Sequence, residues 1–202
     1  MTKTVTGLFD QYADATAAVD QLKAAGISDD DISIVSNNAD GRHKGDTNDV
    51  AEDAGAGAGI GAAVGGVGGL LTGLGIMAIP GVGPVVAAGW LAATAAGAVA
   101  GAVVGGAAGG IIGALTDSGV DERDAHVYAE GVRRGGTLVT AKVDDARASE
   151  AEAILKRSNW VDLPARRTAY EGQGWKGFDD ASKPYTQAEI DADRARYPGR
   201  VL

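Results

Sequence analysis

Two adjacent arginines near the end of a predicted helix are the residues best suited to hold an anion. Arg133 and Arg134 precede Gly135 and Gly136, a glycine pair that typically ends a helix. Their charges could hold a phosphate or a lipid headgroup. A surface pair that stabilises the C-terminal end of the helix dipole explains the same two residues. Both interpretations stay open.

Other residues that could do chemistry are poorly placed for it. His43 lies with Asp40 and Asp46 in a polar stretch, but a metal site needs three or four convergent ligands. Residues 29–31, all aspartate, fit a solvated turn better than an acid/base pair. Residues 57–62 fit a dinucleotide-binding pattern, but no strand directly precedes them. The chain has no cysteine, which excludes disulfides, thiolate metal sites and cysteine nucleophiles. Since none of the other motifs is well placed either, we expect no catalytic residue, no cofactor, no metal and no enzyme activity.

Charge is distributed very unevenly along the chain. The net charge is -9, from 27 acidic and 18 basic residues, which argues against binding nucleic acid. From Ala54 to Thr116 there is no charged residue, and this stretch holds most of the 32 glycines. The N-terminus lacks a basic start followed by an apolar run, so no signal peptide is predicted.

Glycine recurs at every fourth position in two parts of the uncharged stretch. The first set is Gly57, Gly61, Gly65, Gly69 and Gly73, and the second is Gly97, Gly101, Gly105, Gly109 and Gly113. Residues four apart share one helix face, so each set predicts a bare groove that admits another backbone. We therefore predict a glycine-zipper hairpin of two helices, at roughly 55–79 and 85–116. Its turn is predicted at Pro80, Gly81, Gly83 and Pro84.

The charged flanks of the insert predict an α/β domain in two halves. Strands are predicted at 4–9, 32–35 and 137–143, helices at 12–25, 121–134 and 146–157, and a last weak strand at 167–170. These elements predict the α+β class, as a ferredoxin-like βαβ-αβα sandwich with helices on one face. The predicted parts are the first half at 1–36, an acidic linker at 37–53, the hairpin at 54–116, the second half at 117–170 and a tail at 171–202.

The tail carries aromatic residues among polar ones. Trp175, Phe178 and Tyr185 could dock on a partner subunit or cover the domain's own sheet. Thr186 followed by Glu189 is typical of a capping box that opens a short helix. Because an isolated short helix is marginal in water, an ordered tail must lie on something.

Residues 119–139, with Asp121, His126 and Tyr128 before the Gly135 break, resemble the C-terminal half of the bacterial general-stress-protein domain. The first strand, helix and second strand resemble its N-terminal half, so the similarity covers roughly residues 3–165. Members similar to this chain carry a glycine-rich insert between the halves. The resemblance implies a cytoplasmic, stress-induced protein and supplies no catalytic residue.

These observations predict a non-enzymatic stress-response protein that forms homo-oligomers through its glycine-zipper hairpin. The expected partners are the chain itself and a lipid bilayer, at the inner face of the cell membrane. Acidic residues beside the insert count against insertion, because cytoplasmic flanks favour lysine and arginine. The alternatives are a soluble self-assembling particle or filament with hairpins in its core, and a sensor of a small anionic ligand.

Overall fold

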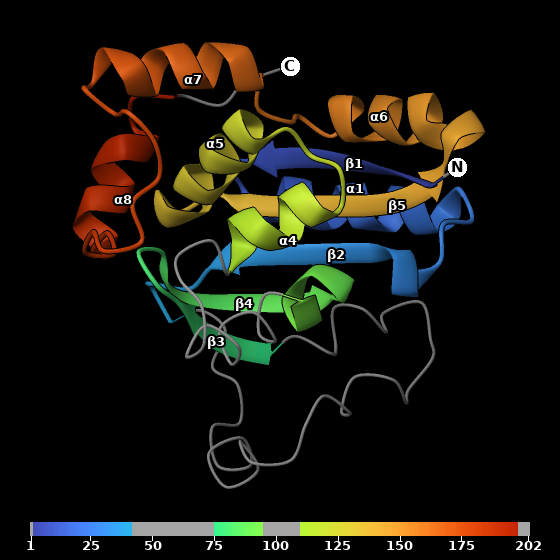
Figure 1. Ribbon diagram of the computed structural model, residues 1–202, viewed down its shortest axis with the longest axis horizontal. Helices are drawn as coiled ribbons and strands as arrows, with labels where there is room; N and C mark the ends of the chain where they lie inside the picture. The colour runs from blue at the N-terminus through green and yellow to red at the C-terminus, as the bar shows by residue number, and fades with distance from the viewer. Residues whose placement is uncertain (1, 42–74, 95–109, 198–202) are drawn as a thin grey trace, which may run out of the picture.

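The computed structural model describes residues 2–41, 75–94 and 110–197. At its centre is a five-stranded sheet with strand order β1-β5-β2-β4-β3, in which every neighbouring pair is antiparallel (Figure 1). The strands are β1 (Thr2–Phe9), β2 (Ile32–Asn37), β3 (Gly75–Ile79), β4 (Gly83–Gly89) and β5 (Thr137–Asp144). Because β1 and β2 both run antiparallel to β5, they are parallel to each other with β5 between them, as in a split βαβ unit.

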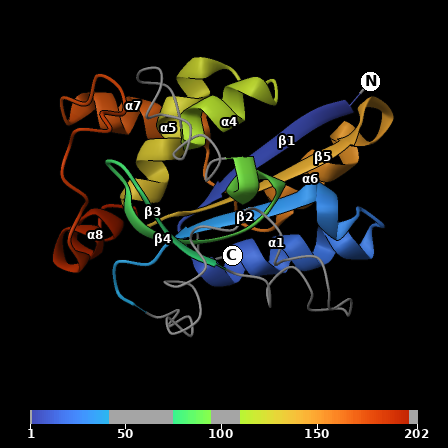
Figure 2. The same cartoon turned by 60° about the horizontal axis from the view of Figure 1, so that its bottom comes forward.

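Helices cover both faces of this sheet, as Figure 2 shows. The helices are α1 (Tyr12–Ala24), α4 (Ile111–Asp117), α5 (Glu122–Arg133), α6 (Ala148–Arg157), α7 (Leu163–Gly172) and α8 (Gln187–Arg194). Short 3-10 turns, η1 and η2, occupy Asp29–Asp31 and Asp145–Arg147, and residues 90–94 are also helical. Helices α1 and α6 pack on one face of the sheet, and α4 and α5 pack on the other. The structure is of the mixed α/β kind that was predicted, but the prediction of helices on one face is wrong.

The strands themselves explain the two covered faces. Along β5, Val139 and Ala141 join the core under α1 and α6, while Leu138 joins the core under α4 and α5. In β2, Ile34 joins the core under α1 and α6, and Val35 joins the core under α4 and α5. All six residues of that strand are buried. A strand with apolar or small residues on both faces needs a layer of helices on each side.

The central part of the chain forms strands where long helices were predicted. Gly75–Ile79 and Gly83–Gly89 pair as the β-hairpin β3–β4, and β4 also pairs with β2. The prediction of one helix over 55–79 and another over 85–116 is therefore wrong at these two segments. The branched residues Val85 and Val86 suit a pleated surface, and both are buried. Residues 54–74 and 95–109 of the predicted hairpin lie outside the described residues.

Residues 80–82 form a turn, but it joins two strands and not two helices, and Gly83 and Pro84 of the predicted turn lie in β4. The Val82 amide donates to the Ile79 carbonyl at 3.1 Å, and Gly81 has a φ of 73°. A type II turn typically has proline at its second position and a residue with positive φ at its third. Pro80 and Gly81 occupy these two positions. A Cβ on Gly81 would lie 2.7 Å from the Asp180 backbone, so the tail packs directly against this turn.

Most of the other predicted elements are confirmed to within a few residues. Asp121 caps α5, its side chain accepting from the Arg123 amide at 3.0 Å, and Gly26 ends α1 with a φ of 83°. The weak strand predicted at 167–170 is wrong, because those residues lie inside α7. Asp162 starts that helix by accepting from the Ala165 amide at 2.9 Å, and Pro164 suits its first turn.

The tail lies on its own chain. Helix α8 opens with the predicted capping box between Thr186 and Glu189. Ile190 of α8 is buried, and a Cβ on Gly135 would lie 2.3 Å from its side chain. Before α8, the Phe178 amide donates to His126 Nδ1 of α5 at 3.1 Å. The tail therefore packs across α5 and the β3–β4 turn.

Replacing Thr186 with alanine should lower the free energy of unfolding by about 1 kcal/mol, because the capping hydroxyl is lost. Thr168→Ala is the matched control, since that exposed hydroxyl only bonds the Pro164 carbonyl within α7. We expect the control to change stability by less than about 0.5 kcal/mol in urea denaturation. Equal effects of the two substitutions would show that the capping box contributes nothing.

Among residues 2–41, 75–94 and 110–197, no helix combines the length and the apolar character needed to cross a bilayer.

Candidate functional site

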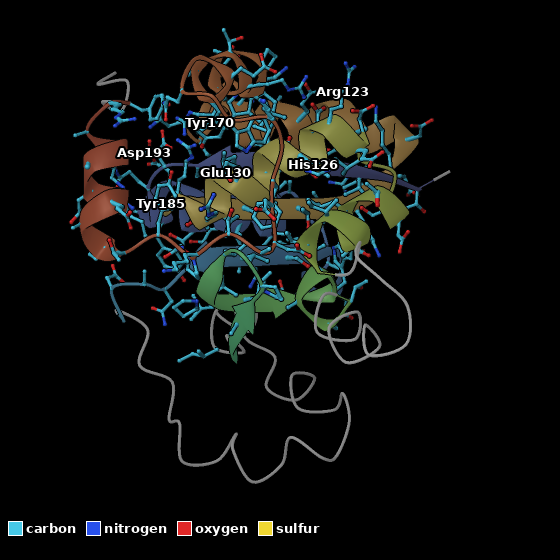
Figure 3. The ribbon with its side chains drawn as sticks, turned by 60° about the vertical axis from the view of Figure 1, so that its left-hand side comes forward. Arg123, His126, Glu130, Tyr170, Tyr185 and Asp193 are labelled. Carbon is cyan, nitrogen blue, oxygen red and sulfur yellow. The ribbon has the colours of Figure 1, made fainter. Side chains whose placement is uncertain are left out.

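A cluster of charged and aromatic side chains gathers where α5, α7 and α8 meet (Figure 3). The C-terminal end of α5 contributes Glu130 and the two arginines that follow it closely. Helix α7 contributes Arg166 and Tyr170, and α8 contributes Asp193. Asp10, directly after β1, completes the cluster. The site therefore draws on four parts of the chain that are far apart in sequence.

Glu130 is the most deeply placed charge of the cluster, with none of its surface exposed. Arg134 donates from Nε to its carboxylate at 2.6 Å, and Arg133 approaches it at 3.3 Å. Arg134 also donates to Asp193 at 3.1 Å and to Gln173 at 2.7 Å. Burial by itself lowers the pKa of Arg134. The hydrogen bond and charge of Glu130, together with the charge of Asp193, outweigh this effect, so the pKa lies above its usual value. Arg134 is therefore a permanent cation that joins α5 to α8.

Arg166 forms the second ion pair of the cluster. Its two terminal nitrogens donate to the two carboxylate oxygens of Asp10 at 2.8 and 2.7 Å. This forked arrangement is the strong geometry for an arginine and a carboxylate. The guanidinium also stacks on the Tyr197 ring, 4.0 Å from its centre. The pair fixes α7 to the end of β1, while the stacked ring joins the last described residues to α7.

Tyr170 lies at the middle of the cluster and is completely buried. The Arg134 guanidinium stacks on its ring at 4.1 Å, and the rings of Trp175 and Tyr197 contact it edge-on. Burial raises the pKa of the Tyr170 hydroxyl more than the charge and hydrogen bond of Arg166 and the charge of Arg134 lower it, so the hydroxyl keeps its proton.

A small cavity lies among the side chains of this cluster. It has room for at most one water molecule. Its polar lining comes mainly from Asp10, Arg134, Arg166, Tyr170, Asp193 and Arg194. These are ion-pairing and hydrogen-bonding groups. Within the described ranges, no group of three or more histidine, aspartate or glutamate side chains is placed to hold a metal ion.

The structure brings together the residues that the sequence singled out at the end of α5 and in the tail. The Tyr185 ring lies under the Arg133 guanidinium at 4.8 Å, and Arg133 donates to the Lys183 carbonyl at 3.0 Å. Trp175 contacts Tyr170, and Phe178 packs against the core under α4 and α5. All three aromatic residues proposed for docking therefore contact their own chain. The anion contact at the arginine pair stays a prediction.

The glycine ladders fall almost entirely outside the described residues. Nine of the ten ladder glycines lie there, as do His43 and the dinucleotide-like stretch 57–62. The tenth, Gly113, lies half-buried in α4, where its carbonyl accepts from the Thr116 hydroxyl at 3.0 Å. The aspartate run at 29–31 forms η1, where Asp29 pairs with Lys23 at 3.0 Å.

Sequence reasoning missed five residues of the cluster. They are Asp10, Glu130, Arg166, Tyr170 and Asp193. Glu130 had a local signal, since it stands three and four residues before the arginine pair, the helical spacing for ion pairs. The other four come from different elements, and no spacing in the sequence connects them.

The comparisons with known proteins identify one domain. Residues 4–78 match the model of the heat-induced stress protein YflT domain. The matched stretch contains α1, β2 and most of β1 and β3, and it ends before the segment 119–139 that carried the resemblance most specifically. No curated protein and no solved structure matches the chain. This match supports the resemblance to the bacterial general-stress-protein family over residues 4–78 of the chain.

Proposed function

We propose that this protein acts in the stress response without catalysis, by associating with copies of itself through its two uncharged glycine-rich segments, 54–74 and 95–109. The YflT domain supports the stress-response role, and its family is not a known family of enzymes. The composition of the two segments supports the association. A backbone with few side chains allows close approach of a second backbone, which gains dispersion contacts and weak Cα–H···O bonds.

The placement of the β3–β4 hairpin carries this proposal. The chain leaves β2 beside the hairpin turn, where the Asn38 amide donates to the Pro84 carbonyl at 2.9 Å. It re-enters at Gly75, which pairs with Ala87 at the other end of the hairpin. The second glycine-rich segment starts beyond that same end and rejoins at Gly110, within reach of Ile79 at the turn. Both segments are thus attached along one margin of the sheet.

That margin suits association. Strand β3 is one of the two edge strands of the sheet, with β1 at the other edge, and it pairs with β4 alone among the described strands. An outer strand offers hydrogen-bonding groups to another chain. The uncharged segments are attached there, while the charged cluster lies at the meeting of α5, α7 and α8. A second copy could therefore approach the β3 margin without meeting strong like charge from the segments themselves.

Replacing both Gly65 and Gly105 with leucine should abolish the association, because two bulky side chains would fill the bare grooves. In light scattering coupled to size exclusion, we expect a particle larger than the 20.2 kDa chain for the unmodified protein and a monomer for the variant. Gly172→Leu is the matched control, because Gly172 is exposed at the end of α7 with open space around it. An unmodified protein that stays monomeric at all concentrations would refute the proposal.

Association at a bilayer is a second proposal, favoured by the absence of charge from Ala54 to Thr116. The same two variants test it in a flotation experiment with neutral phosphatidylcholine vesicles. Flotation of the unmodified protein and of Gly172→Leu, but not of the double leucine variant, would support contact with lipid through these segments. A large particle in detergent-free buffer that does not float would favour self-association in solution.

A further inference from the structure

We infer that two copies of this protein pair through the outer edge of β3, strand against strand, antiparallel about a twofold axis. Such pairing rests on the proposed self-association, and it names the contact that would orient the two copies. Three features of the sheet lead to it: backbone groups of β3 that face outward, protection of the opposite edge at β1, and the absence of charge around β3.

The register of the β3–β4 hairpin decides which backbone groups of β3 face outward. Pro84 has no amide hydrogen, and its carbonyl accepts from the Asn38 amide at 2.9 Å on the side of β2. Alternate residues of an antiparallel strand bond to opposite neighbours, so Ala78, which lies opposite Pro84, does not bond to β4. The amides and carbonyls of Ile76 and Ala78 therefore point away from the sheet. They have no hydrogen-bond partner among the described residues.

The opposite edge of the sheet, at β1, is protected by groups of the same chain. The Thr6 carbonyl accepts from the Tyr128 hydroxyl at 3.1 Å, and the Leu8 carbonyl accepts from the Val161 amide at 2.7 Å. Lys3 also places a charge on this strand. Covering groups and charges are the usual means by which an edge strand avoids pairing with another chain. Within the described residues, β3 has neither of these two protections.

The charge distribution allows a second copy to reach β3. The whole chain carries a net charge of -9, so two copies repel each other over much of their surface. No residue from Ala54 to Thr116 is charged, and β3 lies within that stretch. Two β3 edges can therefore meet without like charges opposite each other, an arrangement that destabilises a pair of strands.

The outward residues of β3 also match those of an identical strand. About a twofold axis at Met77, Ile76 of one copy lies opposite Ala78 of the other, and each such pair exchanges two hydrogen bonds. Ala78 is exposed and Ile76 is half-buried, so a second strand meets small or apolar side chains at these positions. These few hydrogen bonds offset only part of the freedom that two molecules lose on association. The β3 contact therefore orients copies that the glycine-rich segments hold together.

Replacing Ala78 with proline tests this pairing in the full chain. The amide that proline removes faces away from β4, so the β3–β4 hairpin keeps its own hydrogen bonds. Each copy loses one donor to the other, and we expect the dissociation constant of the association to rise at least about tenfold. Sedimentation at several protein concentrations measures it. Ala78→Val is the matched control, because valine keeps the amide and suits a strand, and it should change the constant by less than about threefold.

A single cysteine gives an independent measurement, because the chain has none of its own. Met77→Cys places a thiol at the twofold axis, where the Cβ atoms of the two copies would lie about 4.5–5.5 Å apart. Mild oxidation should therefore link most of the associated protein into covalent dimers. Lys3→Cys, at an exposed position on β1, is the matched control and should stay largely unlinked. If Ala78→Pro does not fold, the comparison of these two cysteine variants decides alone.

The outcomes separate the β3 pairing from the self-association itself. Weaker association of folded Ala78→Pro, or preferential linking of Met77→Cys, would support the pairing. Unchanged association in Ala78→Pro, with no more linking in Met77→Cys than in Lys3→Cys, would overturn the pairing and leave the association through the glycine-rich segments intact. An unmodified protein that stays monomeric at all concentrations would overturn both.

Discussion

Replacing Arg134 with alanine should lower the free energy of unfolding by about 3–5 kcal/mol. The side chain is 7 % exposed and joins Glu130, Gln173 and Asp193 in one set of hydrogen bonds. Its removal would leave the fully buried Glu130 with Arg133 alone, at 3.3 Å, and would leave Asp193 with an exposed arginine. A buried carboxylate that loses its closest cation costs far more than a surface pair contributes.

Arg123→Ala is the matched control for this prediction. Arg123 stands on the same helix, its side chain is 83 % exposed, and its nearest carboxylate oxygen, on Asp121, is 3.8 Å away. We expect a change below about 0.5 kcal/mol for the control in guanidinium denaturation. Arg134→Lys should fall between the two, because a lysine cannot donate to three acceptors in the fixed fork of a guanidinium. A loss below about 1 kcal/mol for Arg134→Ala would contradict the burial and pairing described above.

We also expect the packing of the C-terminal tail to depend on Arg134. Helix α8 reaches the body of the protein through Asp193 and through Ile190 beside Gly135. If Arg134→Ala frees α8, limited proteolysis should cut the tail after residue 173 faster than in the unmodified chain. Cleavage at an unchanged rate would show that the apolar contact of Ile190 is enough to hold α8.

Replacing Gly89 with alanine should lower the free energy of unfolding by about 3 kcal/mol or more. Gly89 has a φ of 88°, where a side chain is strained, and it pairs with Ser33 at the end of β4. A Cβ there would lie 2.1 Å from the Ile32 carbonyl oxygen and 2.8 Å from the Ser33 Cα. Both are backbone atoms of β2, so the strand itself would have to move away from β4.

Gly26→Ala separates the two causes of that loss. Gly26 has a φ of 83°, close to that of Gly89, but nothing lies within 4 Å of the place where its Cβ would be. We expect the control to lose about 1–2 kcal/mol from the left-handed backbone alone. Urea denaturation measures both variants, and amide exchange along β4 reports whether its pairing with β2 is the part that fails. Equal losses would mean that the close approach to β2 contributes nothing.

Several elements could be read from the sequence because their signals are local. Asp121 caps α5, Gly26 ends α1, and Thr186 with Glu189 opens α8, as predicted. Each of these signals acts over three or four residues, through a hydrogen bond or a backbone angle. The turn at Pro80 and Gly81 was predicted for the same reason, since proline and glycine limit the backbone wherever they occur.

The elements on either side of that turn were predicted wrongly for a physical reason. Short apolar runs such as Gly75–Ile79 and Gly83–Gly89 have no period that separates a buried strand from a buried helix. Strand formation was decided by β2, whose residues Ser33–Asn37 pair with β4 across a long stretch of chain. The layer of helices on the second face of the sheet was missed for the same reason. Strand β2 is buried on both sides only when α1 packs on one face and α5 on the other.

The candidate site separates most clearly what the sequence determines from what the tertiary structure determines. The sequence by itself determined that two arginines stand at the end of α5, with Glu130 one helical turn before them. Only the tertiary structure placed Tyr170 and Asp193 against Arg134, and Asp10 against Arg166. Contacts between neighbouring residues follow from helix geometry, whereas contacts between distant elements follow from how the whole sheet and its helices pack.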